Sequence, residues 1–503
     1  MIQNQHNSTP WYLTLFRLMV AACLFVTMAL TFVVAKNERE FMVALLGFFC
    51  VAIVSIPLFA RRDYDLFEPM TLVILLVIFG TPFKIVYALG FRHDDPHVAS
   101  HVLFNQEPEV LLYGLLVSVV GLILLVWGYM LKLPGVNMSF VYMPWVETWN
   151  GRRLQATLLL LGGLSLVSFV AFVAVAGVNF GSLGEMSEKR FGDAREAGSE
   201  RMLSSKYFLY RAAALSKFVV YLSLIWVLRD GRPRLTWLVV ATGVFLLQTM
   251  MLAFIMDSRA NVILILVDCL IIYYFMLKTI DLKVVFGFAA VALMLVIPML
   301  ASRSTSDTES PVGEVMKKTL TGRNMLDIAK TCHIINGVPK KMEFRNGEML
   351  YAWMFAPIPK SYWPEKPMWA NKGVYLNQHI FGYKGDRSGC PPGLIAELYW
   401  DFGKWGVWIG LFIGGILLRQ LYVGFSRHAN NMTSVLIYTM IISRFVMFSL
   451  GMDLGTGIVK AALDVMPLLV LVHFFGMRRV ADSNVQFEMA EPQMTGKQLE
   501  LVR

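Results

Sequence analysis

Long apolar runs alternate with short polar segments along this chain, and the apolar runs are close to the length of a membrane-crossing helix. They cover about residues 12–35, 41–60, 67–90, 110–131, 155–180, 209–228, 234–256, 260–277, 283–301, 404–423, 432–452 and 456–476. A helix needs about 20 apolar residues to cross a bilayer, and it satisfies its own backbone hydrogen bonds there. The pattern predicts an all-α, polytopic membrane protein with about twelve transmembrane helices.

Two polar segments are much longer than the other connections. One covers about residues 181–208, and the other covers about residues 302–403, before the tenth predicted span. We therefore expect four regions, of which the first, 1–301, holds the first nine spans and the smaller outer loop. A large periplasmic loop (302–403), the last three spans (404–480) and a cytoplasmic tail (481–503) follow it. A long connection of this kind is usually functional.

Basic residues are concentrated in one set of connections. If the N-terminus is cytoplasmic, every inner loop and the tail carry Lys or Arg, among them Arg61, Arg62, Lys132, Arg152, Arg153, Arg229, Lys278, Lys283, Arg419, Arg427, Arg478 and Arg479. The outer connections include the acidic pair Asp94 and Asp95. The positive-inside rule then predicts that both termini are cytoplasmic. The first apolar run is too long for the core of a cleavable signal, so we expect it to be retained as a span.

Composition agrees with a membrane protein and argues against a nucleic-acid-binding one. The chain has 503 residues, of which 56% are hydrophobic and only 16% are charged, against about 25% in a typical soluble domain. Its formal net charge of +10 is explained by the basic inner loops, and there is no zinc-finger spacing and no RNA-binding signature. Cys332 and Cys390 share the large outer loop, where a disulfide between them is one possibility.

Cations and aromatic residues are interleaved in the large loop. Guanidinium and ammonium groups suit phosphate, and aromatic faces suit the C–H face of a sugar ring, so the loop could bind a sugar diphosphate-lipid. The alternative is an interfacial aromatic belt whose cations meet lipid headgroups. The candidate binding residues are Arg323, Arg345, Lys360, Lys366, Trp363, Trp369 and Tyr399.

A short helix is expected to begin after Gly393 and to end at Gly403. Glu397 lies on it among apolar residues, where a carboxylate is costly unless it is paired, and Arg387 is the nearest cation in sequence that suits it. Glu397 is therefore either a structural ion-pair partner or a group that positions or deprotonates an acceptor hydroxyl. Arg259, in an Asp-Ser-Arg turn between two predicted spans, either pairs within the turn or reaches a phosphate.

Four ionisable residues fall within or at the ends of predicted spans: Asp268, Arg444, Asp453 and Asp464. Such residues are candidates for function, or they join helices to one another, and Arg444 could pair with a carboxylate on a neighbouring helix. The chain has no Walker A, zinc-protease or nucleophile-elbow motif. His333 and His379 are isolated, so we predict no metal site and no cofactor.

Two stretches resemble the Wzy family of O-antigen and exopolysaccharide polymerases. One is the outer Asp-Ser-Arg turn at 257–259; the other combines Pro-Lys-x-x-Trp-Pro-x-Lys-Pro at 359–367 with Pro-Pro-Gly-Leu-Ile-Ala-Glu-Leu-Tyr-x-x-Phe-Gly-x-x-Gly at 391–406. At the first stretch the chain has Asp257 where the family commonly has glycine.

The resemblance implies a metal-independent, inverting glycosyltransferase in the bacterial inner membrane. It would join undecaprenyl-diphosphate-linked oligosaccharide repeat units on the outer face, with a flippase and a chain-length regulator as possible partners. By matching position, Arg259 and Arg387 would hold the leaving diphosphate, with Lys366 in support. Glu397 stands at the acidic position of the second motif, and we interpret it as a base.

Three other functions fit parts of the pattern. An O-antigen ligase would share the fold and the donor but use a different acceptor. A transporter or flippase of the lipid-linked unit should carry its cations within the spans, whereas here they appear concentrated in one outer loop. A structural subunit of an export complex would leave the cation and aromatic cluster unexplained.

Overall fold

The computed structural model describes most of the helical core and part of the large outer segment. The described residues are 10–90, 108–136, 138–175, 205–230, 236–255, 259–288, 290–291, 327–355, 372–381 and 391–478, with Ile358, Tyr362, Trp363 and Glu365. The predicted smaller loop lies almost entirely outside these residues, as does the predicted tail.

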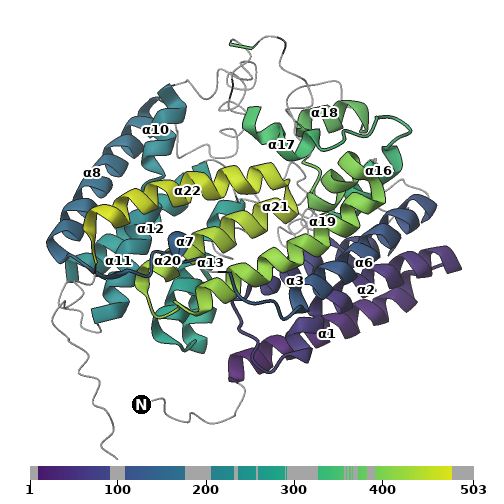
Figure 1. Ribbon diagram of the computed structural model, residues 1–503, viewed down its shortest axis with the longest axis horizontal. Coiled ribbons are helices and arrows are strands. Elements are labelled where there is room, and N and C mark those ends of the chain that lie inside the picture. Colours follow the sequence, from purple (N-terminus) through teal and green to yellow (C-terminus); the bar gives the residue numbers. More distant parts are fainter. Residues whose placement is uncertain are drawn as a thin grey trace, which may run out of the picture.

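Helices make up nearly all of the described chain (Figure 1). The first half contains α1 (Trp11–Val34), α2 (Glu38–Ala60), α3 (Pro69–Gly80), α4 (Pro82–Gly90), α6 (Pro108–Met130), α7 (Ser139–Tyr142), α8 (Gly151–Val175), α10 (Ser205–Ala213) and α11 (Ser216–Asp230). The second half contains α12 (Thr236–Ile255), α13 (Arg259–Leu277), α16 (Ile328–Gly337), α17 (Glu348–Phe355), α18 (Lys372–His379), α19 (Leu394–Ser426), α20 (Met432–Ile441), the π-helix η3 (Ile442–Val446), α21 (Met447–Gly451) and α22 (Leu454–Phe475). Two short antiparallel strands, β1 (Val146–Trp149) and β2 (Gly476–Arg478), pair with each other.

Eight helices in the described part are long and apolar enough to cross a membrane, and three shorter apolar helices accompany them. Many apolar side chains on these helices point outward; Phe25 on α1, Val167 on α8 and Val470 on α22 are 76%, 69% and 71% exposed. Outward apolar surface of this extent suits contact with lipid rather than water. The prediction of an all-α polytopic membrane protein is confirmed.

Most predicted spans coincide with helices, but two of them are broken. The predicted span 67–90 consists of α3 and α4, which are separated at Thr81 (φ −124°, ψ −79°). Proline has no N–H and disfavours helical geometry in the residue before it, so Pro82 accounts for the break. The predicted span 209–228 is likewise divided into α10 and α11. The predicted span 283–301 lies mostly outside the described residues.

The tenth predicted span and the short helix expected before it belong to one element. α19 starts at Leu394 and runs for 33 residues. Its path is interrupted at Gly403, whose φ of 64° and ψ of −155° are not helical. This conformation is essentially restricted to glycine. A short helix that ends at Gly403 is therefore confirmed, but the next helix follows without an intervening loop.

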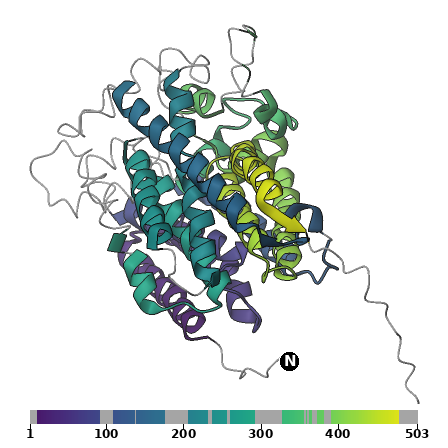
Figure 2. The ribbon, with the colours of Figure 1, turned by 90° about the vertical axis from the view of Figure 1, so that its left-hand side faces the viewer.

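The long helices lie side by side in one bundle, with α16, α17 and α18 gathered toward one end of it (Figures 1 and 2). α16 packs on α6 and α19, and α17 packs on the beginning of α22, where Gly455 faces Trp353. The strand pair lies at the opposite end of α22, because β2 follows Phe475 directly. The helices α16–α18 thus cover the end of the bundle at which α22 begins.

Candidate functional site

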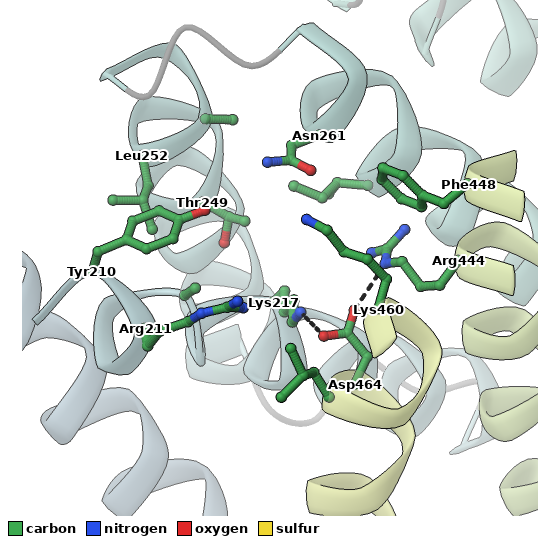
Figure 3. A pocket seen from close by; sticks show the side chains of 14 residues that line it. Tyr210, Arg211, Lys217, Thr249, Leu252, Asn261, Arg444, Phe448, Lys460 and Asp464 are labelled. Carbon is green, nitrogen blue, oxygen red and sulfur yellow. Dashed lines mark hydrogen bonds and ion pairs between the residues drawn. The ribbon is translucent and has the colours of Figure 1, made fainter. Parts of the chain in front are cut away.

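A pocket with charged walls lies among helices from both halves of the chain (Figure 3). Its empty volume is about 640 Å³, including its open mouth. Side chains from α10, α11, α12, α13, η3, α21 and α22 line it, and the polar or charged ones are Tyr210, Arg211, Lys217, Thr249, Asn261, Arg444, Lys460 and Asp464. Four of these are Lys or Arg and one is a carboxylate, so the pocket wall is predominantly cationic.

Asp464 joins two of the cations. Lys217 on α11 donates to its Oδ1, and Nε of Arg444 donates to its Oδ2 at 2.8 Å. Nη2 of Arg444 also donates to Oδ2 of Asp268 on α13 at 2.9 Å, and the Tyr221 hydroxyl donates to the same oxygen at 2.7 Å. The prediction that Arg444 pairs with a carboxylate on a neighbouring helix is confirmed. These contacts fix Arg444 and Lys217 at the pocket wall.

Arg444 stands in the π-helical turn η3, between α20 and α21. A π turn contains an extra residue compared with an α turn, and such turns are frequent at functional sites because they redirect side chains. The side chain of Arg444 is only 7% exposed, so its charge depends on Asp268 and Asp464. The π turn therefore places a paired cation at the pocket wall.

Lys460 differs from the other cations of the pocket. Its Nζ lies 5.0 Å from the centre of the Phe448 ring, and no carboxylate of the described chain lies within ion-pair distance of it. The negative charges of Asp464 and Asp268 balance the positive charges of Lys217 and Arg444, and Lys460 therefore adds excess positive charge to the pocket. Arg211 also lines the pocket and interacts with another group. A cation in apolar surroundings attracts an anionic group far more strongly than one in water.

A second charged cluster lies where α18, α19 and α22 meet. Glu397 is completely buried, and Nζ of Lys372 donates to its Oε1. Asp453, the N-cap of α22, lies 3.4 Å from the same Nζ through its Oδ1. Arg387 lies outside the described residues, so the partner of Glu397 that the structure describes is Lys372.

The predicted loop residues are only partly described. Nη2 of Arg345 donates to the Tyr375 hydroxyl at 2.9 Å, Trp363 contacts the Phe355 ring edge-on, and the Tyr399 hydroxyl lies 3.3 Å from that of Tyr113. Arg259 begins α13, two residues before the pocket residue Asn261, but its side chain is not described. The residues that lie outside the described chain are Arg323, Lys360, Lys366, Trp369 and Arg387.

Sequence reasoning missed the two lysines of the pocket. Lys217 and Lys460 both lie inside helices that are long and apolar enough to cross a membrane. A lysine within a membrane span is itself a signal of function, so the same rule that singled out Arg444 and Asp464 would have found them. Their presence also corrects the argument that the cations concentrate in the outer loop.

Cys332 is a free thiol in the structure, and Cys390, the other half of the possible disulfide, lies outside the described residues. Its Sγ lies 3.6 Å from the Leu111 carbonyl oxygen, buried between α16 and α6. Within the described ranges, no three His, Cys, Asp or Glu side chains gather as they would around a metal ion.

The helical bundle with its cationic pocket defines a multi-pass membrane protein suited to an anionic ligand. The family described as "Putative O-antigen polymerase" matches residues 204–460, which are 257 of the 503 residues. The chain belongs to this family, and the matched region contains all of the pocket-lining residues except Leu463 and Asp464. No curated protein and no solved structure matches the chain.

Proposed function

We propose that this protein polymerises undecaprenyl-diphosphate-linked oligosaccharide repeat units on the outer face of the bacterial inner membrane. Its family supports a polymerase of surface polysaccharide that uses a lipid-linked substrate. The observation that carries the proposal is the cationic pocket among membrane helices, with Lys460 as its excess charge. A lipid diphosphate has an anionic headgroup and an apolar tail, and this pocket offers complementary surroundings to both.

The chemistry follows from the leaving group. A hydroxyl of the incoming unit attacks the anomeric carbon of the growing chain, the bond from that carbon to the diphosphate oxygen breaks, and the diphosphate-lipid departs. The proton that the attacking hydroxyl loses passes to water at the outer face. Negative charge increases on the departing oxygen, and preorganised cations stabilise it better than water can. Lys460 and Arg444 provide such cations. Lys217 pairs with Asp464, and its charge offsets the negative charge of that carboxylate, so the field in the pocket stays positive.

The outer segment would complete the site. Arg259 stands next to the pocket in sequence, and Arg387 and Lys366 would approach the diphosphate from the outer face. Arg345, Trp363 and Tyr399 would contact sugar, together with Arg323, Lys360 and Trp369. Basic inner loops support cytoplasmic N- and C-termini, with the end of the bundle that carries α16–α18 facing outward.

Cations within spans are also expected of a transporter of the same lipid-linked unit, and that alternative is favoured by Lys217, Arg444 and Lys460. A ligase would use the same donor. The three functions differ in what accumulates when the protein is absent, because a polymerase is needed only to extend the first repeat unit.

The test is deletion of the gene in its native host, followed by gel separation of the surface polysaccharide. Complementation uses wild type, Lys460→Met, Arg259→Ala and Arg387→Ala. The matched control is Lys404→Met, since Lys404 also lies near aromatic rings, those of Trp405 and Trp408, but lies outside the pocket.

We expect the deletion strain to attach a single repeat unit and to lose the ladder. Lys460→Met should reduce the polymer about 100-fold, as loss of one transition-state donor does, while Lys404→Met should restore it. Long polymer held on the carrier lipid, with none on the surface, would indicate a ligase. Absence of any surface sugar, with repeat units trapped inside, would indicate a transporter.

A further inference from the structure

Lys372, Glu397 and Asp453 form a buried cluster in which one cation serves two carboxylates. Lys372 opens α18, Glu397 lies in the first turn of α19, and Asp453 caps α22. Their side chains are 7%, 0% and 12% exposed. Two carboxylates buried so close together repel each other unless a cation lies between them, so Lys372 offsets this repulsion.

Both carboxylates accept hydrogen bonds from the first turn of α22. Oε2 of Glu397 accepts the Leu454 N–H at 2.7 Å, while its Oε1 is held by Lys372. Oδ1 of Asp453 accepts the Thr456 N–H at 2.8 Å, and its Oδ2 accepts the Thr456 hydroxyl at 2.7 Å. A helix leaves its first N–H groups without partners and carries partial positive charge there. Glu397 thus acts as a second, remote cap of α22.

The capped helix is the one that carries Lys460 and Asp464 into the pocket. At about 1.5 Å per residue, Lys460 lies roughly 10 Å along α22 from Asp453. α22 also packs on α8, α17, α20, η3 and α21. The contacts at its first turn fix the end of the helix that lies nearer to Lys460.

Two contacts, one turn apart, join α18 to α19. Lys372 reaches Glu397, and Tyr375, one turn further along α18, stacks on Trp400, one turn further along α19, with 5.6 Å between ring centroids. Burial alone would lower the pKa of Lys372, but Glu397 and Asp453 together raise it. Lys372 is therefore charged at physiological pH and binds the outer helix to α19 and α22 at once.

We propose that Lys372 and Glu397 are positioning residues, which join the outer segment to α22 and so hold Lys460 and Asp464 in place for the anionic substrate. This inference rests on the proposed function. It gives Glu397 a role other than the general base that the motif suggests, because both of its oxygens are engaged and its side chain is completely buried. Neither residue touches the reacting atoms in this arrangement.

The two roles of Glu397 give opposite results in a double mutant. Lys372→Met leaves Glu397 and Asp453 facing each other without a cation, and it should lower polymer formation about tenfold or more. Glu397→Gln keeps an acceptor for the Leu454 N–H, so it should lower polymer formation only about threefold. In Lys372→Met/Glu397→Gln the repulsion is gone but the link from α18 is still missing, so polymer formation should rise above that of Lys372→Met and stay below that of Glu397→Gln.

The measurement is polymer formed per amount of folded, membrane-inserted protein, in membrane vesicles supplied with lipid-linked repeat units. The pH profile separates positioning from loss of folding: Lys372→Met should regain activity as the pH falls, since protonation of one carboxylate relieves the repulsion. Lys340→Met is the matched control, because Lys340 is an exposed lysine of the same outer segment whose Nζ contacts only the Asn336 side chain at 2.9 Å among described residues.

A general base could not be restored in this way. If Glu397 deprotonates the acceptor, Glu397→Gln and the double mutant should both lose about 10²–10⁴-fold, and the positioning role is refuted. It is also refuted if Lys372→Met has the activity and pH profile of Lys340→Met. If wild-type vesicles extend no repeat units at all, the proposed function itself fails, and this outcome does not depend on any of the variants.

Discussion

Arg444 donates to Asp268 at 2.9 Å, and this contact joins the π-helical turn η3 to α13 in the interior of the bundle. Asp268 is completely buried, and Arg444 is the only cation in the described chain that forms an ion pair with it. Asp464, by contrast, has Lys217 as well as Arg444. The two carboxylates that Arg444 holds therefore depend on it to very different degrees.

Replacement of Arg444 by Met should destabilise the protein through Asp268. Removing one partner of a buried ion pair leaves the other charge uncompensated, which costs about 3–5 kcal/mol. Asp464 keeps Lys217, so most of the loss should arise at Asp268. Unfolding of the purified protein in mild detergent, followed by heating or by titration with SDS, measures the change in the free energy of unfolding.

The double variant Arg444→Met/Asp268→Asn identifies the source of the loss. Because the unpaired carboxylate of Asp268 is replaced by a neutral amide, the double variant should be more stable than Arg444→Met alone, by about 1–3 kcal/mol. It should still polymerise poorly, since the pocket lacks its guanidinium. Equal stability of the single and double variants would show that Asp268 is not the residue that depends on Arg444.

Gly114 on α6 lets α16 approach closely. A Cβ added at residue 114 would lie 2.6 Å from both Cα and Sγ of Cys332. Gly114→Ala should therefore push α16 away and lower stability by about 1–3 kcal/mol. Gly163→Ala is the control, because a Cβ there meets nothing within 4 Å. Accessibility of Cys332 to a small thiol reagent should rise in the first variant and stay unchanged in the second.

The helices were largely predictable because lipid demands long apolar runs, and such runs are visible in the sequence. Their interruptions were harder to foresee. Pro82 gives a local reason for the break between α3 and α4, but the π turn around Arg444 has no such marker and follows from packing and ion pairing in three dimensions. The short helix before the tenth span was predictable, because Gly393 and Gly403 mark its two ends in the sequence.

The candidate site was less predictable than the fold. Arg387 was the natural partner of Glu397 by nearness in sequence, whereas the described partner, Lys372, lies 25 residues away on another helix. Ion pairs of this kind are set by helix packing, which an isolated sequence does not display. The pocket lysines, in contrast, could have been found, since Lys217 and Lys460 stand out within apolar helices.

Gly403 should resist substitution because of its backbone. Its φ of 64° with ψ of −155° is costly for any residue that has a Cβ. Gly403→Ala should lose about 1–3 kcal/mol of stability. Gly414→Ala on the same helix is the control, since its only near neighbour, a Leu125 methyl, lies at an ordinary 3.7 Å. Equal unfolding midpoints for the two variants would contradict the need for glycine at 403.

His333 should make the outer segment sensitive to acid. It lies on α16, stacked on Phe381 with 5.2 Å between ring centroids. Burial, with a contribution from Lys341, lowers its pKa from 6.5 to about 4. The folded protein therefore disfavours the protonated imidazole, while the unfolded chain accepts the proton readily.

The sign of the pH effect follows from proton binding. Between about pH 6.5 and 4 the unfolded state binds more protons at His333 than the folded state, so stability falls as the pH falls through this window. His333→Phe keeps the ring that stacks on Phe381 and removes the titration. Its unfolding midpoint should decline less than that of wild type between pH 7.5 and pH 5, roughly the upper part of the window. Parallel declines would assign the acid sensitivity to other groups.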